Sequence, residues 1–591
     1  MRHAANAARM RLYLSINRQG NKGSKMADNN KLILDYVYAH EAMRPDHLWL
    51  TQPTGGGAVT DYTWRQTMDQ ARRMAAFIKS RNFEPGARIA ILSKNCAHFF
   101  MAELAIWMSG CTTVAIFPTE TADTIRYVLD HSGASMLFVG KLDTWAQQAS
   151  AVRDDLPCVA FPLAPDSAKS GMDTWDSVVS RTEPLAGQPG RAGDEIALLM
   201  YTSGSTGQPK GVMHRFDRIT RASEGIVGNI RGAIGATEEI RILSYLPLAH
   251  VFERAWIECA AMVEGSGHIF FAEALETFVA DLQRARPTVF ISVPRLWLKF
   301  QQGVFTKMPA KKLDFLLGLP IIGKLIGKKV LRGLGLDSVK HAGSGSAPIP
   351  AALIAWYRKL GLNLVEGYGM TEDFAYSNTS SIKLNAPGYV GSPLPGVVTR
   401  ISDEGEVLIK SPGQLAGYYK QPELNAECFT EDGFFRTGDL GEVRSDGLLK
   451  LTGRKKELFK TGKGKYIAPA PIENRINTHP MIELSMVSGV GQQAAYAVVV
   501  LAEDLRPKVT DPNVREEVNS NLGALLAEVN NALADYEQLR MFVVAPEPWT
   551  IDNGCLTPTM KIKRARIEAV HSFPTRRSSD LMEERRVGKE C

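Results

Sequence analysis

The sequence contains no long uninterrupted apolar run and little cysteine. No stretch reaches the roughly 18 consecutive apolar residues of a membrane-spanning helix, so we expect no transmembrane segment. The seven cysteines show neither C-x-x-C nor metal-ligand spacing. Reduced thiols of a cytoplasmic protein are the simplest interpretation, which argues against a disulfide-stapled scaffold or a zinc module.

The body of the chain also lacks an excess of one charge. The formal net charge is +6, of which residues 1–25 contribute +6 and residues 571–591 contribute +1, so the remainder carries −1. A near-neutral body gives no support for nucleic-acid binding. With 591 residues the chain is too long for one ordinary core, and we expect two or more domains.

The two ends carry no pattern that indicates folding. Residues 1–25 hold six bases and no acid, which fits either a transit-like peptide or upstream sequence before a start at Met26. We favour the second, because "MADNNKLILDYVYAH" begins a helical pattern. Back-translated, "HSFPTRRSSDLMEERRVGKEC" (His571 to Cys591) resembles a sequencing adapter followed by its own complement. We interpret it as an assembly artefact, with an ordinary basic tail as the alternative.

A glycine- and hydroxyl-rich loop, "YTSGSTGQPKG" (Tyr201 to Gly211), is the most informative feature present. The apolar "DEIALLM" before it predicts a buried strand, and the residues after it can begin a helix, so we expect a strand-to-helix loop. Glycines let backbone amides approach an anion, and a closing lysine suits phosphate. The spacing is not the G-x-x-x-x-G-K-[ST] of a P-loop. The loop therefore predicts a nucleotide-phosphate site, with a solvated turn as the alternative.

Small residues and oxygen ligands recur further along the chain. "HAGSGSAPIP" (His341 to Pro350) would let a flat ring lie against the backbone. "VEGYGMTED" offers Tyr368 for stacking, and Thr371 and Glu372 as oxygen ligands. These features are modest one by one, and their conjunction indicates a nucleotide site.

Two Asp-Gly pairs and a lone histidine complete the set. In "DGFFRTGDLGEVRSDGLLKLTGR" (Asp432 to Arg454) the Asp-Gly pairs predict hairpins, and we expect Asp439 in a loop where its carboxylate can accept two ribose hydroxyls. "YLPLAHVFER" (Tyr245 to Arg254) contains a histidine of the kind that is usually structural.

Together, "YTSGSTGQPKG", "YGMTE", "TGDL" and "GRKKELFKTG" resemble the adenylate-forming superfamily over Leu32 to Glu568. "SYLPLAHVFER", "GRKKELFKTGKGKYIAPAPIEN" and "LTPTMKIKR" look most like long-chain fatty acyl-CoA synthetases. The resemblance implies an α/β fold, with a large N-terminal multi-sheet domain (26–453), a hinge (454–456) and a small mobile α+β lid (457–570).

The resemblance also implies a role for each matching residue, with ATP, Mg²⁺ and coenzyme A as ligands. The phosphate loop would be Thr202, Ser203, Gly204, Ser205, Thr206, Gly207 and Lys210. For the nucleotide and its metal, the other positions are Thr202 and Glu372 for magnesium, Gly343, Ser344, Glu366, Gly367 and Tyr368 for adenine, Thr371 for phosphate, Asp439 for ribose and Arg454 as a nearby nucleotide contact. For the lid, they are Lys456 at the hinge, Lys561 as the mobile catalytic lysine, and Lys460 to Tyr466 on the face used in thioester formation.

Three positions depart from the family pattern. Met560 stands where many relatives have glycine, and Lys456 where many have aspartate, although lysine occurs there in long-chain members. Arg254 occupies the position that gates the fatty-acid tunnel in some relatives.

The implied reaction is ATP-dependent conversion of a fatty acid to acyl-AMP, with release of pyrophosphate, and then to acyl-CoA. The alternatives are transfer to a carrier-protein thiol, a synthetase for a shorter or aromatic carboxylate, and a non-catalytic nucleotide-binding scaffold. The scaffold is disfavoured because the phosphate, magnesium, ribose and lid-lysine positions are all filled.

The lysine-rich apolar segment 311–335 has two interpretations. We favour a helical pair packed on the large domain. The alternative is a peripheral membrane contact through which a fatty acid enters. We expect a cytoplasmic protein. If residues 311–335 contact a membrane, we expect the protein to be attached peripherally to it.

Overall fold

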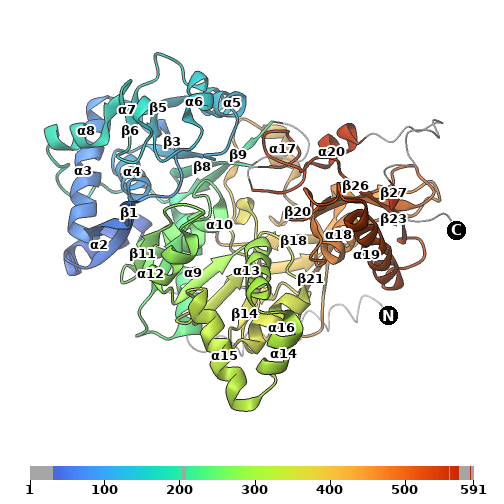
Figure 1. The fold of residues 1–591 in the computed structure, drawn as a ribbon. Helices are drawn as coiled ribbons and strands as arrows, with labels where there is room; N and C mark the ends of the chain where they lie inside the picture. Colours follow the sequence, from blue (N-terminus) through green and yellow to red (C-terminus); the bar gives the residue numbers. More distant parts are fainter. Residues whose placement is uncertain (1–30, 203–207, 558, 572–585, 588–591) are drawn as a thin grey trace.

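The computed structural model describes residues 31–202, 208–557, 559–571 and 586–587. Most of the chain, from blue to light orange in Figure 1, forms one large α/β body of several sheets. The segment that follows β21 forms a smaller α+β unit beside it, drawn in orange and red. The large body and the small unit have the predicted architecture.

The largest sheet has eight strands in the order β19-β9-β8-β4-β3-β5-β6-β7. Strands β8, β4, β3, β5, β6 and β7 run parallel, and β9 and β19 join antiparallel at one edge. The apolar run before the glycine-rich loop is β8, as predicted. The bounds are β3 Arg88–Leu92, β4 Thr112–Ile116, β5 Ala134–Val139, β6 Cys158–Ala160, β7 Asp173–Thr174, β8 Ile196–Thr202, β9 Lys210–Arg215 and β19 Gly417–Tyr418.

Three smaller sheets complete the large domain. A five-stranded sheet contains β12 Val289–Ser292, β13 His341–Ser344, β14 Leu364–Tyr368, β15 Asn378–Thr379 and β16 Ser392–Pro393. A four-stranded sheet contains β10 Arg241–Ser244, β11 His268–Phe271, β1 Leu48–Gly55 and β2 Ala58–Thr63. An antiparallel sheet contains β17 Val398–Ile401, β18 Glu406–Lys410, β20 Phe435–Val443 and β21 Leu449–Arg454.

The small unit is built on β24 Ile482–Ser488, β25 Ala495–Leu501, β26 Leu539–Val544 and β27 Arg586–Val587, with a separate hairpin of β22 Phe459–Lys460 and β23 Tyr466–Ile467. Its helices are α18 Pro469–Ile476, α19 Pro512–Asn531 and α20 Arg564–Val570. Strand β25 and helix α19 share an apolar core that is separate from the cores of the large domain. Because the small unit has its own hydrophobic core, it can move as one rigid body.

Helices cover the faces of the sheets in the large domain. They are α2 Ile33–Met43, α3 Trp64–Ser80, α4 Ala97–Met108, α5 Ala122–Ser132, α6 Trp145–Gln148, α7 Asp166–Lys169, α8 Trp175–Arg181, α9 Phe216–Ile234, α10 Val251–Glu253, α11 Ala260–Glu264, α12 Phe278–Ala285, α13 Pro294–Lys307, α14 Ala310–Leu317, α15 Pro320–Gly333, α16 Ala351–Lys359 and α17 Pro422–Glu427. Helix α2 is the helix that the pattern after Met26 predicts.

No helix among the described residues is both long enough and apolar enough to cross a membrane.

Helix α4 is buried on every side and carries one of the two acids of a buried ion cluster. Its Glu103 pairs with Arg254, which also lies 3.2 Å from Glu258. All three side chains are fully buried. Arg254 and Glu258 belong to a π-helical turn, Arg254–Cys259, between α10 and α11. Arg254, which the resemblance places at the tunnel-gating position, is therefore fixed in the core.

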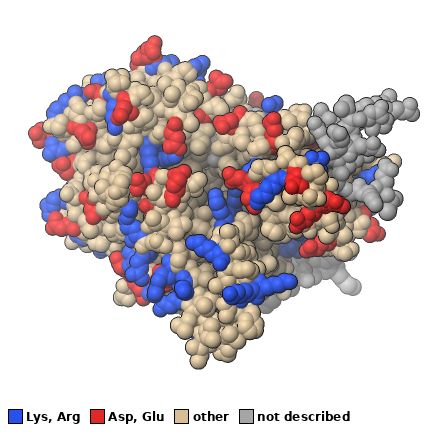
Figure 2. Space-filling model, in the orientation of Figure 1, with Lys and Arg blue, Asp and Glu red and all other residues tan. Residues whose placement is uncertain are grey.

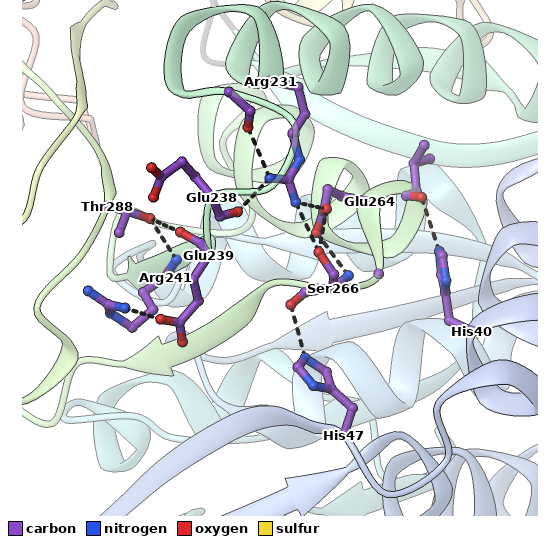
Figure 3. Close-up of polar contacts among 12 residues, drawn as sticks. His40, His47, Arg231, Glu238, Glu239, Arg241, Glu264, Ser266 and Thr288 are labelled. Atoms are coloured by element: carbon purple, nitrogen blue, oxygen red, sulfur yellow. Dashed lines mark hydrogen bonds and ion pairs between the residues drawn. The ribbon is translucent and has the colours of Figure 1, made fainter.

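A polar network holds the far end of α9, the helix that follows β9 (Figure 3). Arg231 donates to the carbonyl oxygen of Glu238 at 2.6 Å, to the hydroxyl of Ser266 at 2.9 Å and to the carboxylate of Glu264. His47 donates to the carbonyl of Ser266 at 3.0 Å. The network ties α9 to α11 and to the segment between α2 and β1, so the scaffold behind the glycine-rich loop is anchored at both ends.

Candidate active site

The glycine-rich loop joins two antiparallel strands, β8 and β9, so the prediction of a strand-to-helix loop is wrong. Helix α9 begins only at Phe216, after β9. Strand β9 forms because it pairs on one side with β8 and on the other with β19, which lies about two hundred residues away in sequence. Such tertiary pairing overrides a local pattern that contains no helix breaker.

The base of this loop carries two of the predicted phosphate residues. Thr202 and Lys210 face each other in register. The Lys210 ammonium lies 5.7 Å from the centre of the Tyr418 ring on β19. Ser203, Gly204, Ser205, Thr206 and Gly207 lie outside the described residues.

A short 3₁₀ turn, Thr371–Asp373, lies against the same strands. Tyr418 donates its hydroxyl to Glu372 Oε1 at 2.8 Å, and His214 on β9 donates to the Thr371 carbonyl at 2.8 Å. Burial lowers the pKa of His214 to about 4, so this ring is neutral near pH 7. The predicted magnesium and phosphate residues are thus fastened to the strands that hold the loop.

The predicted ribose residue, Asp439, forms one hydrogen-bonded group with Tyr368 and Arg454. Tyr368 donates its hydroxyl to Asp439 Oδ2 at 2.6 Å, and Arg454 Nε donates to Asp439 Oδ1 at 2.9 Å. Asp439 faces Arg454 in the β20–β21 ladder. The expectation that Asp439 lies in a loop is therefore wrong. It lies inside β20, next to Gly438, whose φ is +72°.

The Asp439 carboxylate still has acceptor positions for hydrogen bonds from a ligand. An ionised carboxylate offers about four acceptor positions, so Asp439 can accept further hydroxyl groups. The Asp446-Gly447 turn connects β20 and β21 as an antiparallel hairpin, as predicted. Asp432-Gly433 also lies in a tight turn, in which Gly433 N donates to Thr430 O at 2.9 Å.

The predicted adenine residues lie on two adjacent parallel strands, β13 and β14. Ser344 and Glu366 are register partners and both are buried. Ser344 Oγ and Glu366 Oε2 have no hydrogen-bond partner among the described residues. Burial raises the pKa of Glu366 to about 8. Buried polar atoms are nearly always partnered, so these two atoms retain hydrogen-bonding capacity that a ligand could use.

Glycines keep the same two strands close to each other and to their neighbours. A Cβ atom on Gly343 would lie 3.1 Å from the Ile291 side chain, and one on Gly367 would lie 3.5 Å from the Asn378 carbonyl. A side chain at position 343 would therefore crowd β12, whereas one at position 367 would make only an ordinary contact with β15.

The predicted mobile lysine comes from the small unit and points into this group. Lys561 lies on a short turn in which Thr557 N donates to Lys561 O at 2.8 Å and Lys561 N donates to Thr557 Oγ1 at 3.1 Å. Burial and the charge of Arg454 lower the pKa of Lys561, and the charges of Asp439, Glu372 and Glu457 oppose that shift. Solvent still reaches the side chain. Lys561 is therefore within electrostatic range of large-domain residues while its side chain stays exposed to solvent.

The turn that carries Lys561 has a strained residue. Met560 has φ +61°, in the left-handed region that favours glycine. Arg564, just after the turn, pairs with Glu473 at 2.6 Å and approaches Glu457 to 3.5 Å, so the base of the turn is tied to the start of the small unit.

The predicted hinge and thioester residues lie apart from this group. Lys456 is exposed in the 3₁₀ turn Lys455–Glu457, directly after β21. Lys460 and Tyr466 are register partners on β22 and β23, with the ammonium 5.6 Å from the ring centre. No hydrogen bond, ion pair or ring contact within the described part of the chain joins Lys460 or Tyr466 to the other predicted site residues.

Two residues that position the site, Tyr418 and His214, were not predicted. They hold the Thr371–Asp373 turn, as described above. Nothing local in the sequence marks Tyr418. His250, the histidine expected to be structural, is half-buried and caps α10, where its Nδ1 accepts from Phe252 N at 3.2 Å. Desolvation and the charge of Lys561 lower the pKa of His250 to about 3.

This arrangement agrees with the comparisons with known proteins. The profile of the family described as "AMP-binding enzyme" matches residues 38–419, and that of its C-terminal domain matches residues 458–573. The chain belongs to the AMP-binding enzyme family. That result confirms the predicted resemblance to the adenylate-forming superfamily.

Relatives with similar sequences are long-chain ligases. The chain is 31% identical to the long-chain-fatty-acid–CoA ligase FadD15 of Mycobacterium bovis, over 89% of this chain and 94% of that protein. It is 28% identical to the human long-chain-fatty-acid–CoA ligase 1, over 85% of this chain and 80% of that protein.

A solved structure with the same fold is the A domain of a carboxylic acid reductase from Segniliparus rugosus in complex with AMP. It has a TM-score of 0.76 and 24% identity, and the match covers 92% of this chain and 94% of that one. This likeness confirms the fold: a large N-terminal α/β domain with a smaller C-terminal domain.

Proposed function

We propose that this protein is a long-chain fatty acid–CoA ligase that forms an acyl-AMP intermediate. The observation that carries the proposal is the position of Lys561 from the small unit, close to Asp439, Arg454 and Glu372 of the large domain. A cation placed at that junction suits a reaction in which a carboxylate and a phosphate must approach each other.

The large domain would hold the nucleotide. Asp439 would accept the ribose hydroxyls, and the unpartnered Ser344 and Glu366 oxygens would meet adenine. With its raised pKa of about 8, Glu366 is mostly protonated at pH 7 and can donate as well as accept. Lys210 and the loop amides would face the phosphates.

The donor set suits Mg²⁺ in combination with the nucleotide. Among the described residues, no three His, Cys, Asp or Glu side chains are arranged to hold a metal ion by themselves. Mg²⁺ is typically bound by one or two carboxylates together with substrate phosphates and water. Glu372 and Thr202 are oxygen ligands of that kind. Mg²⁺ bound there would neutralise part of the phosphate charge.

The first half-reaction needs positioning and charge rather than a protein nucleophile. A fatty-acid carboxylate oxygen attacks the α-phosphorus of ATP, and pyrophosphate leaves. The Lys561 ammonium would attract both the carboxylate and the α-phosphate, reducing their repulsion as the bond forms. The orientation of the small unit in this structure suits that step.

The second half-reaction needs another orientation of the small unit. The thiol of coenzyme A gives up its proton to solvent, its thiolate attacks the acyl carbon, and AMP leaves. Rotation about the hinge near Lys456 would withdraw Lys561 and present the Lys460–Tyr466 hairpin. The separate core of the small unit supports such a rigid rotation.

A pyrophosphate-release assay with palmitate, acetate, benzoate and amino acids tests the proposal. We expect turnover with palmitate that requires ATP, and formation of palmitoyl-CoA on addition of coenzyme A. Turnover with amino acids alone would refute it, and so would transfer only to a carrier-protein thiol. Preference for acetate or benzoate would assign a shorter or aromatic substrate.

The proposal also concerns where the enzyme works. We place it in the cytoplasm, with peripheral contact to a membrane through residues 311–335. A membrane is where long-chain fatty acids accumulate, because burying each CH₂ group is favourable by about 0.8 kcal/mol.

A further inference from the structure

The hairpin of α14 and α15 exposes large apolar side chains at its tip. Phe315, Ile321 and Leu325 are 69%, 77% and 64% exposed, and Ile322 is 48% exposed. Ile321 and Leu325 are four residues apart, so they lie on one face of α15. In Figure 1 this hairpin forms the lower end of the molecule.

The opposite face of the hairpin is firmly packed on the large domain. Leu313 and Leu331 are buried in a core that includes Trp297 and Leu360. A Cβ atom on Gly327 would lie 2.7 Å from the Leu360 carbonyl, so α15 approaches the neighbouring backbone closely. The favoured interpretation of a packed helical pair is therefore correct, and the exposed apolar tip is a fixed surface.

The same two helices carry five exposed lysines. Lys311, Lys312, Lys324, Lys328 and Lys329 are all exposed. Asp314, the one acid between Ala310 and Gly333, forms an ion pair with Lys359 at 3.0 Å. Figure 2 shows the lower end of the molecule as mostly tan, with blue side chains above it.

We propose that the α14–α15 tip docks on an anionic lipid bilayer, with Phe315, Ile321 and Leu325 inserted at the interface and the lysines facing lipid headgroups. The exposed apolar side chains match the acyl chains of such a bilayer, and the nearby lysines match its anionic headgroups. Helices of 8 and 14 residues are shorter than the roughly 20 residues that span a bilayer, so the contact is interfacial. The docking rests on the proposed function only in that the bilayer would supply the fatty acid.

Sedimentation with vesicles tests the docking. The full chain is mixed with vesicles of phosphatidylcholine alone, or of phosphatidylcholine with phosphatidylglycerol, at low and high salt. We expect binding to the anionic vesicles that weakens with salt. The triple variant Phe315→Ser, Ile321→Ser, Leu325→Ser should lose at least about tenfold of that affinity. The double variant Lys324→Glu, Lys328→Glu should lose about as much without changing the apolar tip.

A matched control separates this surface from exposed hydrophobic residues in general. Leu275, between β11 and α12, is 75% exposed, and Leu275→Ser should bind vesicles like the wild type. Equal binding by the triple variant, or equal binding of the wild type to neutral and anionic vesicles, would overturn the proposal. Self-association that the triple variant abolishes, in a protein that does not bind vesicles, would instead assign the tip to a contact with a second copy.

Activity with octanoate supplied from solution distinguishes failure of the docking from failure of the proposed function. We expect the triple variant to retain pyrophosphate release with octanoate while losing vesicle binding. A wild type that binds vesicles but activates no fatty acid would refute the function and leave the docking intact.

Discussion

The ribose side and the lysine side of the candidate site are held in different ways. Asp439 lies within a long strand, and both of its oxygens are engaged, by Tyr368 from another sheet and by Arg454 from the neighbouring strand. Lys561 lies on a short exposed turn with the strained Met560 beside it. The groups that we propose hold the nucleotide through both half-reactions are fixed by sheets. The lysine that we propose acts in one half-reaction is carried by a small unit with a core of its own.

The sharpest test of this difference is Lys561→Ala, for which we expect the largest effect. Loss of one electrostatic contact to a transition state typically lowers a rate about 10²–10³-fold, so acyl-AMP formation should fall by at least that factor. Thioester formation from synthetic acyl-AMP and coenzyme A should survive. Equal loss of both half-reactions in a folded variant would contradict the two-orientation assignment.

The pH dependence of the same step provides a control. The Lys561 ammonium exists below its pKa, and that pKa is lowered, so adenylation should decline on the alkaline side at a lower pH than an ordinary lysine would give. Lys561→Arg keeps the cation at every accessible pH and should remove this decline, whatever its absolute rate.

On the ribose side we expect Asp439→Asn to weaken binding of the adenine nucleotide in both half-reactions, which is ATP in the first and acyl-AMP in the second. The change removes the charged partner of Arg454 and of the ribose, and hydrogen bonds to charged groups contribute about 1.5–3 kcal/mol, which corresponds to roughly a tenfold to hundredfold rise in KM for ATP. Tyr368→Phe, which keeps the carboxylate, should have a smaller effect. A variant impaired only in adenylation would show that Asp439 acts with Lys561 rather than with the nucleotide.

Glu372→Gln tests the metal assignment. It retains an oxygen that can accept from Tyr418 but removes the anionic ligand, so the Mg²⁺ concentration for half-maximal adenylation should rise about tenfold. Tyr418→Phe keeps the carboxylate and should shift the titration less. If Glu372→Gln titrates like the wild type, Glu372 is not a magnesium ligand.

On the lysine side, Met560→Gly should produce a small gain in stability. A left-handed backbone costs roughly 1–2 kcal/mol for a residue with a Cβ atom, and glycine avoids it. Met560→Ala keeps the Cβ atom and serves as the control. Thermal unfolding should show a higher midpoint for the glycine than for the alanine variant, and the reverse order would contradict the assigned conformation.

The smallest effect is expected from removal of residues 571–591. Melting temperature and activity should stay essentially unchanged. A second truncation that keeps His571 retains its hydrogen bond with Trp549 at 3.4 Å, worth about 1 kcal/mol at most. A large loss in both truncations would show that the pairing of β27 with β26 contributes to the fold and that this tail is protein sequence.

Local patterns predicted much of the fold and the site. The run before the glycine-rich loop is a strand, and both Asp-Gly pairs form turns, because neighbouring residues determine these features. The β9 strand and the position of Asp439 were predicted wrongly, since each depends on pairing with a distant segment. Tyr418 was missed for the same reason. Its partner Glu372 is 46 residues away in sequence.

The buried cluster of Arg254, Glu103 and Glu258 limits which substitutions this chain can accept at position 254. Burial raises the pKa of Glu258 well above its usual range, and the Arg254 guanidinium pairs with the buried Glu103 carboxyl group. Replacing Arg254 alone would leave an uncompensated buried charge, which typically costs about 3–5 kcal/mol. Glu103 must therefore change together with Arg254, and the two positions should be inherited as a pair. A designer who wishes to place another side chain at position 254 faces a double substitution, of which the first step alone would be strongly unfavourable.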